Sequence, residues 1–511
     1  MRAIIKAIGG GACALVMLLG TPALAGTLRD DVRAWRGANE RAVVGELADF
    51  VAIPNVADKV SDIERNAAAA EAMLQRRGLK TRRLSAGPGT PPSVYGELRT
   101  PGARRTIVFY AHMDGQPAPG EGWFSDPFTP VMRDGPPRLG APDIDWRNLS
   151  GPMNPEWRLY GRSTSDDKSP IVALMAALDA VRASGRKPSV NIKVFLEGEE
   201  EAGSAHLAQI IHDNLDLLRA DAWLLLDGPV HQSRAMQVVF GARGVVGLEA
   251  TIYGPTRALH DGHYGNWAPN PGVLAAHLVA ELRAEDGRIL IPGFYDDVRP
   301  LNDAEKAALA AMPPMEAELL ASLGLARAET TDRLADAVSR PALNLRGIVV
   351  GGVGENANNA VPTQARISID FRLVPDETPE TTRKRVEDFL RAGGWFVTDA
   401  EPDQATRLAH PKIVRLQWSS GYAAVRTDMT LPVSQAVIAS VGRWQGGAPI
   451  VLPMIGGSLP MAYFSETGVP LIIVPMVNHD NSQHAVNENL RLKNLWDGIE
   501  VYAALIADLN W

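Results

Sequence analysis

The feature that most constrains this chain is a series of apolar segments, each followed closely by imidazole or carboxylate side chains. Residues 106–110, 190–196 and 222–226 are such segments, and they run into His112, an acidic stretch and Asp227. Uninterrupted apolar runs that alternate with helical patterns are typical of strands buried in a parallel sheet. Ligands of open α/β sheets bind beyond the carboxyl ends of the strands. The sequence therefore predicts an α/β fold with titratable groups gathered at one edge of a mainly parallel sheet.

The pattern of elements changes twice along the chain. Residues 26–240 alternate between strand and helix patterns, whereas residues 241–430 contain half-buried, alternating strands and amphipathic helices. From residue 431 to residue 511 the first pattern returns. We therefore expect a discontinuous α/β domain, residues 26–240 and 431–511, interrupted by a smaller α+β domain at residues 241–430.

Periodicity and helix-stop signals predict several individual elements. Helices are expected at residues 60–78, 169–183, 271–283, 303–337 and 488–509. The stretch from Arg133 to Glu156 is rich in Pro, Gly, Asp and Asn, and this composition predicts a long surface loop.

The N-terminal residues have the pattern of a secretory signal peptide. Arg2 and Lys6 precede a small-residue apolar stretch, and residues 23–25 fit the small-x-small site of signal peptidase. The stretch is shorter than a membrane span requires. We expect residues 1–25 to be removed by cleavage after Ala25, with export of the mature chain, most simply to a bacterial periplasm. No membrane span is expected in the mature chain.

Composition restricts the chemistry of any site. The single cysteine, Cys13, lies inside the expected signal peptide, so a metal would have to be held by nitrogen and oxygen donors. The chain carries 51 basic and 59 acidic residues. That balance argues against nucleic acid or an anionic membrane as a partner.

Five side chains supply the donors that two neighbouring divalent ions need. They are His112, Asp166, Glu201, Asp227 and His484. Hydrolytic two-metal sites hold their ions about 3.5–4 Å apart, and there the ions lower the pKa of a water molecule and clamp a substrate oxygen. Zinc suits such donors, and manganese or cobalt are alternatives. The five residues therefore predict a site for two divalent metal ions, assigned as Zn2+.

Six segments together resemble the di-zinc aminoacylase and carboxypeptidase family, metallopeptidase family twenty. They are YAHMD at 110–114, LYGRSTSDDK at 159–168, LEGEEEAGS at 196–204, LHDGHYG at 259–265, GGSLP at 456–460 and HAVNE at 484–488. The family includes glutamate carboxypeptidases, carnosinase-type dipeptidases, acetylornithine deacetylase and succinyl-diaminopimelate desuccinylase. The resemblance extends from about residue 32 to the C-terminus and is strongest to the dipeptidase branch.

The resemblance implies a role for each candidate ligand. Asp166 would bridge the two ions. His112 and Asp227 would complete the shell of one ion, and Glu201 and His484 would complete the shell of the other.

The resemblance also assigns two of the neighbouring acids. Asp114 would orient the imidazole of His112 from outside the metal shell. Glu200 would be the general base that takes a proton from the bridging water and passes it to the leaving amine. A register shifted by one residue would bring Glu199 into these roles in place of Glu201.

The inserted domain resembles a ferredoxin-like lid and dimerisation domain. In a homodimer, His260 would reach the partner subunit's site and stabilise the oxyanion. His263, close to His260 in the sequence, is a candidate for a second substrate contact. Arg372 would grip the substrate carboxylate, and Asn359 would also touch substrate. The loop that receives the C-terminal end of the substrate would contain Gly456, Gly457 and Ser458.

Together these residues imply an exported, metal-dependent peptidase that hydrolyses dipeptides or removes C-terminal residues of small peptides. A deacylase or amidohydrolase acting on N-acyl amino acids is the near alternative. A substrate-binding protein that keeps the fold without turnover is the remote one.

Overall fold

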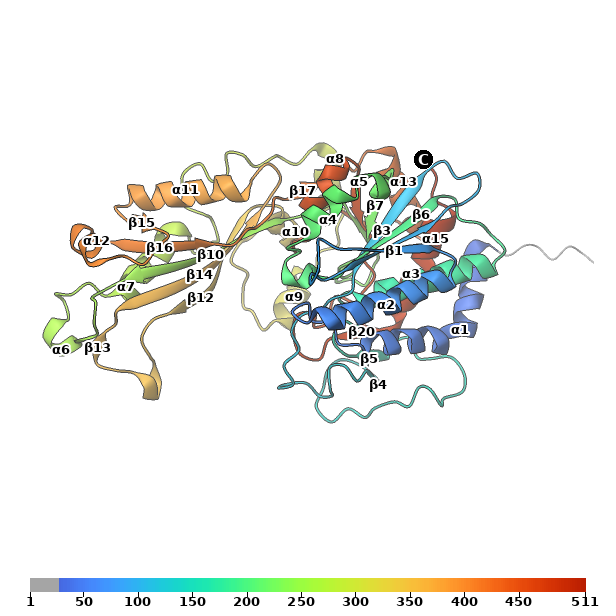
Figure 1. Cartoon of the computed structure of the whole chain (residues 1–511), viewed down its shortest axis with the longest axis horizontal. Coiled ribbons are helices and arrows are strands. Elements are labelled where there is room, and N and C mark those ends of the chain that lie inside the picture. The colour runs from blue at the N-terminus through green and yellow to red at the C-terminus, as the bar shows by residue number, and fades with distance from the viewer. Residues whose placement is uncertain (1–26) are drawn as a thin grey trace, which may run out of the picture.

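The computed structural model describes residues 27–511 and contains two large sheets that lie beside each other along the longest axis (Figure 1). The larger sheet has eight strands and the smaller has five. The expected signal peptide, residues 1–25, lies outside the described residues. Among the described residues, no helix has the length and apolar character that a membrane crossing requires.

The eight-stranded sheet has the strand order β1-β2-β6-β3-β7-β19-β8-β18. Its strands are β1 Lys80–Leu84, β2 Ser93–Leu98, β3 Thr106–His112, β6 Asn191–Glu197, β7 Ala222–Leu225, β8 Gln237–Val239, β18 Ile450–Leu452 and β19 Leu471–Ile473. The central strands β6, β3, β7 and β19 are parallel, which confirms the predicted core of the sheet. The pairs β1–β2, β2–β6 and β19–β8 are antiparallel, so the sheet is mixed.

Alternate residues of the central strands enter two cores on opposite faces of this sheet. In β3, Ile107 and Phe109 belong to one core, and Val108 and Tyr110 belong to the other. The first core is covered by α1 Leu28–Val51, α2 Val60–Arg76, α3 Lys168–Ala183, α13 Pro432–Gln445 and α15 Leu492–Ala507. The second is covered by α4 Leu207–Asp213, α5 Leu215–Leu218 and α14 Met461–Phe464. Burial on both faces explains why the strands are continuous apolar runs in the sequence.

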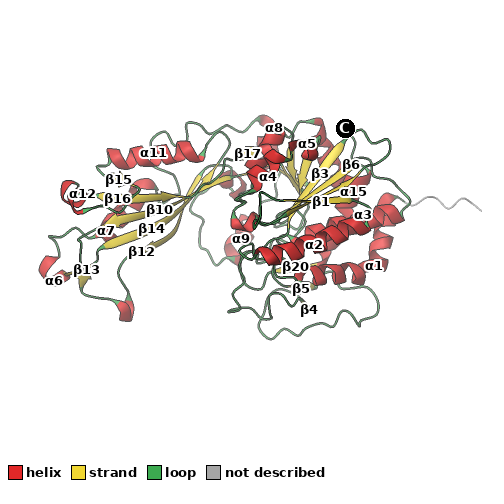
Figure 2. Cartoon of the chain, viewed as in Figure 1, coloured by secondary structure: helices red, strands yellow, loops and turns green. Residues whose placement is uncertain are grey.

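The five-stranded sheet has the order β12-β14-β10-β16-β15 and forms an α+β body with the helices around it (Figure 2). Its strands are β10 Gly244–Tyr253, β12 Ala342–Val349, β14 Gln364–Leu373, β15 Phe396–Thr398 and β16 Ile413–Trp418. Helices α7 Pro271–Leu282 and α11 Pro379–Ala392 share a core with this sheet, in which Leu278 and Val386 are buried. We refer to this α+β body as the lid.

Short elements complete the fold. They are β4 Val131–Arg133, β5 Arg158–Tyr160 and β20 Asn489–Arg491 in one small sheet, β9 Gly241–Ala242 with β17 Val425–Arg426, β11 Leu259–His260 with β13 Ala360–Val361, α6 Asp261–Tyr264, α12 Gln404–Ala409, and the 3-10 helices η1 Glu200–Ala202, η2 Gly354–Asn356 and η3 Ser465–Thr467. The β9–β17 pair lies where the chain passes between the two large sheets. Between β4 and β5 the chain has no helix or strand, as its composition indicates.

Two predicted helices are wrong in extent. The single helix expected at residues 303–337 is three short helices, α8 Asp303–Ala310, α9 Glu316–Ser322 and α10 Leu334–Val338. Pro313, Pro314 and Gly324 lie between them, and proline removes a backbone donor that a continuous helix needs. The C-terminal helix begins at Leu492 rather than at residue 488, because the residues before it form β20 and pair with β5.

Candidate metal centre

The candidate metal donors lie at the carboxyl ends of adjacent parallel strands. β3 ends at His112, β6 is followed by η1, and Asp227 follows β7 by two residues. Because β6, β3 and β7 are neighbours in the sheet, these three chain ends meet at one edge. Asp166, in the loop before α3, and His484, in the loop before β20, reach the same edge.

The structure brings the five predicted ligands together in two groups that share one carboxylate. His112, Asp166 and Asp227 form one group, and Asp166, Glu201 and His484 form the other. Within each group the donor atoms lie within 4.8 Å of one another. Oδ1 of Asp166 is 2.9 Å from Nε2 of His112, and Oδ2 is 3.2 Å from Nε2 of His484. One carboxylate thus offers a separate oxygen to each side of the centre, the arrangement that a bridging ligand requires.

The charges of this cluster fit divalent cations. Burial, reinforced by the charge of Asp166, raises the pKa of Asp227 to about 7 and the pKa of Glu201 to about 8. Hydrogen bonding to Asp166 raises the pKa of His484 to about 9 despite burial. Buried carboxylates that repel one another need compensating positive charge. Nitrogen and oxygen donors of this kind suit zinc and similar ions.

Glu200 lies beside both groups and belongs to neither of them. Its carboxylate is 4.0 Å from Nε2 of His112. Burial raises the pKa of Glu200 well above its ordinary value, and the charges of Asp227 and Glu201 act in the same direction. The carboxylate of the preceding Glu199 accepts a hydrogen bond from the ring of His206 at 2.9 Å. Glu200, and not Glu199, is therefore the acid of this pair that lies next to the donor groups.

Asp114 holds η1 in place as well as contacting His112. Its two carboxylate oxygens accept hydrogen bonds from the backbone N–H groups of Glu200, at 3.0 Å, and Glu201, at 2.9 Å. The Nδ1 atom of His112 lies 3.2 Å from the Asp114 carbonyl oxygen and 3.4 Å from its carboxylate. Asp114 thus contacts His112, a member of one donor group, and holds the backbone of Glu201, a member of the other.

Three further residues near the centre were not predicted from the sequence. Gln116 donates to the carboxylate of Glu201 at 2.8 Å, and Gln483 donates to that of Asp166 at 3.0 Å. Glu488 is fully buried and accepts hydrogen bonds from the loop that precedes α3. The amides have no distinctive sequence pattern. Glu488 does have a signal in the sequence, because it is a charged residue at the end of the HAVNE segment, residues 484–488, and precedes an apolar helix.

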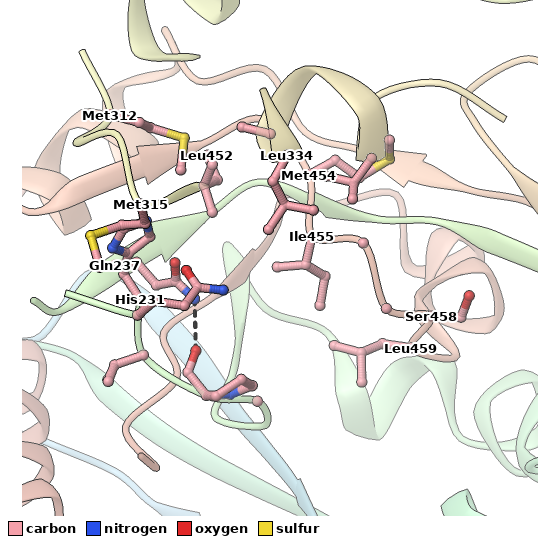
Figure 3. A pocket seen from close by; sticks show the side chains of 18 of the residues that line it. His231, Gln237, Met312, Met315, Leu334, Leu452, Met454, Ile455, Ser458 and Leu459 are labelled. Atoms are coloured by element: carbon pink, nitrogen blue, oxygen red, sulfur yellow. Dashed lines mark hydrogen bonds between the residues drawn. The ribbon is translucent and has the colours of Figure 1, made fainter. Parts of the chain in front are cut away.

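Four of the predicted substrate-binding residues line one cavity together with three of the candidate metal donors, Asp166, Asp227 and His484. The cavity has a volume of about 530 Å³, and Arg372, Gly456, Gly457 and Ser458 contribute to its wall. Ser458 is seen among the lining residues in Figure 3. Nη1 of Arg372 donates to Oγ of Ser458 at 2.7 Å, and its Nε donates to Asp370 at 2.7 Å. A guanidinium and a hydroxyl therefore meet near the donor cluster, with capacity to bind an anionic group.

His260 and Asn359 lie elsewhere. Both are exposed at the end of the lid that is farthest from the eight-stranded sheet in Figure 1, where β11 pairs with β13. The backbone N–H of Asp261 donates to the carbonyl of Asn359 at 3.2 Å. The ring of His263 lies against that of His260 in a tilted arrangement, with centroids 4.6 Å apart. Within a single chain, none of these side chains lines the cavity.

The fold and the sequence match characterised peptidases over most of their lengths. The Cys-Gly metallodipeptidase dug1 of Schizosaccharomyces pombe is 24% identical over 445 residues, covering 82% of this chain and 83% of that protein. The Beta-Ala-His dipeptidase of Homo sapiens is 25% identical over 468 residues, covering 88% and 85%.

A solved structure is also similar to this chain over most of its length. The M20 family metallo-carboxypeptidase Sso-CP2 of Sulfolobus solfataricus superposes with a TM-score of 0.75 at 25% identity, covering 91% of this chain and 98% of that chain. The family model described as Peptidase family M20/M25/M40 matches residues 108–508, a range that contains every candidate metal donor. With its candidate metal donors inside the matched range, the chain is a metallopeptidase and belongs to Peptidase family M20/M25/M40.

Proposed function

We propose that this protein is a metal-dependent dipeptidase whose centre holds two divalent ions. The observation that carries the proposal is the pair of donor groups joined by Asp166, with Glu200 beside them and Arg372 in the same cavity. The similar Cys-Gly and Beta-Ala-His dipeptidases favour dipeptides as substrates.

In this proposal one ion is held by His112, Asp166 and Asp227, and the other by Asp166, Glu201 and His484. Divalent cations so held supply Lewis-acid polarisation of a carbonyl and a water of lowered pKa. Zinc is the ion we assign, with manganese or cobalt as alternatives.

Proton transfer falls to Glu200. Its carboxylate takes a proton from the attacking water and then delivers it to the nitrogen of the departing amine. Burial raises the pKa of Glu200, and a carboxyl group of weakened acidity can take up a proton in the first step and return it in the second. Asp114 holds the backbone of Glu200 and keeps the carboxylate within reach of the reacting atoms.

The far end of the substrate is bound by Arg372 and Ser458. The C-terminal carboxylate accepts hydrogen bonds from the guanidinium and the hydroxyl, and the backbone of Gly456 and Gly457 leaves room for it. This contact fixes the distance between the carboxylate and the scissile bond. Small peptides, rather than long chains, are therefore expected to reach the metal centre and the Arg372–Ser458 pair at the same time.

We further propose that the active form is a homodimer in which His260 completes the site of the partner subunit. The imidazole is 60% exposed and distant from its own cavity, so only a second chain gives it a role in oxyanion stabilisation. Asn359 lies at the same end of the lid and would enter the partner's site with it.

The test is metal content and dipeptide hydrolysis of the purified chain from residue 26, with Glu200→Ala beside it. Two ions in both proteins and turnover in the wild type alone are expected. Glu199→Gln is the matched control, because this neighbouring acid contacts His206 instead of the centre, and it should retain turnover. Absence of stoichiometric metal from the wild type would overturn the proposal.

The same preparation separates the alternatives. Hydrolysis that survives N-acetylation of the substrate would favour an N-acyl amino acid deacylase over a dipeptidase. Two bound ions without turnover of either substrate type would favour a binding protein.

Export is part of the proposal and is supported by the pattern of residues 1–25 alone. An N-terminus at residue 26 in protein recovered from the periplasm or medium is the expected result. An intact N-terminus in the cytosol would contradict it.

A further inference from the structure

One wall of the cavity consists of residues that neither bind the metal nor catalyse. Residues 303–340, which we call the cap segment, run between the lid helix α7 and strand β12 and contain α8, α9 and α10. The segment lines the cavity with Met312, Met315, Leu319, Leu334 and Val338. Facing it are Leu452, Met454, Ile455 and Leu459 from the eight-stranded domain (Figure 3). Methionine-rich surfaces of this kind adapt to apolar groups of different shape.

Two charged residues of the cap segment, Arg333 and Glu316, line the cavity, and both are hydrogen-bonded within the segment. The guanidinium of Arg333 donates to the carbonyl oxygens of Leu309 and Met312, at 3.1 and 2.9 Å. The carboxylate of Glu316 accepts from the backbone N–H groups of Met315 and Leu334, at 3.1 and 3.2 Å. These charges are therefore committed to backbone groups of the cap segment itself.

Two further polar residues that line the cavity, His231 and Gln237, are neutral and hydrogen-bonded to the protein. Burial lowers the pKa of His231, and its Nδ1 accepts from the backbone N–H of Ser233 at 3.1 Å. Gln237 donates to the carbonyl of Pro229 at 2.6 Å. Glu316 and Arg333 lie 3.8 Å from each other and are engaged as described, so a charged substrate side chain placed against this wall would lose its hydration without gaining a free ionic partner.

The apolar wall is continuous with the residues proposed to bind the substrate carboxylate. Ile455 immediately precedes Gly456, and Leu459 immediately follows Ser458. Val338 of the cap segment packs so closely on Gly456 that a Cβ atom there would lie 3.0 Å from it. When Arg372 and Ser458 bind the substrate carboxylate, the substrate side chain nearest to this apolar wall is therefore that of the C-terminal residue.

We infer that the cap segment forms an apolar specificity pocket for the C-terminal residue of the substrate, which accepts large uncharged side chains such as leucine, methionine or phenylalanine. The inference rests on the proposed function, because Arg372 and Ser458 locate the carboxylate. Leu334 is 43% exposed at this wall, an apolar surface that a substrate side chain would cover.

The first experiment measures kcat/KM for two series of dipeptides, one varied at the C-terminal residue and the other at the N-terminal residue. Leucine, methionine and phenylalanine at the C-terminus are expected to exceed aspartate and lysine by at least about 100-fold, since a charge would be desolvated without a partner. Binding of the same peptides to Glu200→Ala is measured in parallel, so that selectivity is observed even without turnover.

The second experiment places a charge in the pocket. Leu334→Lys should raise the ratio of C-terminal aspartate to C-terminal leucine cleavage at least about 10-fold, and Leu334→Glu should do the same for lysine. Leu325→Lys is the control, because Leu325 is 51% exposed and does not line the cavity. Opposite effects of the two charges cannot arise from misfolding.

The outcomes separate the two proposals. Peptide turnover with no preference for the C-terminal side chain, or with selectivity only in the series varied at the N-terminal residue, would contradict the proposed specificity pocket. Selective binding to Glu200→Ala without turnover by the wild type overturns the dipeptidase proposal and leaves the pocket standing.

Discussion

The side-chain oxygen Oε1 of Glu488 lies 2.9 Å from the backbone nitrogen of Asp166, the residue shared by both donor groups. The same carboxylate accepts from the backbone N–H groups of Ser163 and Ser165 and from the guanidinium of Arg162. Glu488 follows His484 by four residues, so one buried side chain joins the loops that carry two of the candidate ligands.

Replacement of this carboxylate should loosen both loops without removing a ligand. Glu488→Gln keeps one acceptor oxygen and turns an amide donor toward groups that also donate. We expect a 10- to 100-fold loss of metal affinity, the usual effect of changing a residue that supports ligands from outside the shell. Competition of the purified variant against a metal chelator measures this. Glu500→Gln, another largely buried glutamate held by an arginine, is the control, and equal losses in both variants would contradict the idea.

The sharing of Asp166 predicts a difference in metal stoichiometry. Asp166→Asn should remove both ions, whereas His484→Asn should remove only the ion of its own group. The reason is that a single carboxylate contacts both imidazoles, with one oxygen for each. Metal analysis after gel filtration gives the ratio directly. Two ions retained by Asp166→Asn would show that the carboxylate does not bridge.

Glu377 predicts a pH dependence of stability that is separate from the centre. Burial raises the pKa of Glu377 to about 7, and one of its oxygens accepts from the backbone N–H of Val374 at 2.9 Å. The folded chain therefore binds this proton more tightly than the unfolded chain does. The stability that Glu377 contributes is present below about pH 4.5 and is lost as the pH rises through about 7.

Glu377→Gln should remove this dependence. Relative to the wild type, the variant should gain up to about 3 kcal/mol of unfolding free energy between pH 4.5 and 8. Urea unfolding at several pH values measures the gain. Glu380→Gln removes an exposed charge three residues away and serves as the control. A gain independent of pH would contradict the mechanism.

The position of His260 predicts complementation between two inactive variants. Glu200→Ala and His260→Ala should each be inactive as homodimers. Mixed subunits should recover about a quarter of wild-type activity, because half of the dimers then contain one complete site. Co-refolding of the two variants and assay of the mixture test this. Activity no higher than that of the separate variants would place His260 outside catalysis.

The strands and ligands at the sheet edge could be predicted because their signals are local. Residues 106–110 are buried on both faces, so their run is apolar throughout, and His112 ends it. By contrast, residues 489–491 form a strand only because they pair with residues 158–160, more than three hundred positions earlier. No local pattern marks such a pairing. The amides of Gln116 and Gln483 were missed for a similar reason, since only the folded chain shows which carboxylates they reach.

The segment from residue 303 to residue 340 contributes no strand to either large sheet, although it walls the cavity. Apart from Leu309 and Ala335, which are buried in the second core, its residues can therefore vary without disturbing strand pairing or the candidate donor groups. Substrate preference can therefore change through substitutions in one stretch of about forty residues, while the residues at the candidate metal centre stay the same.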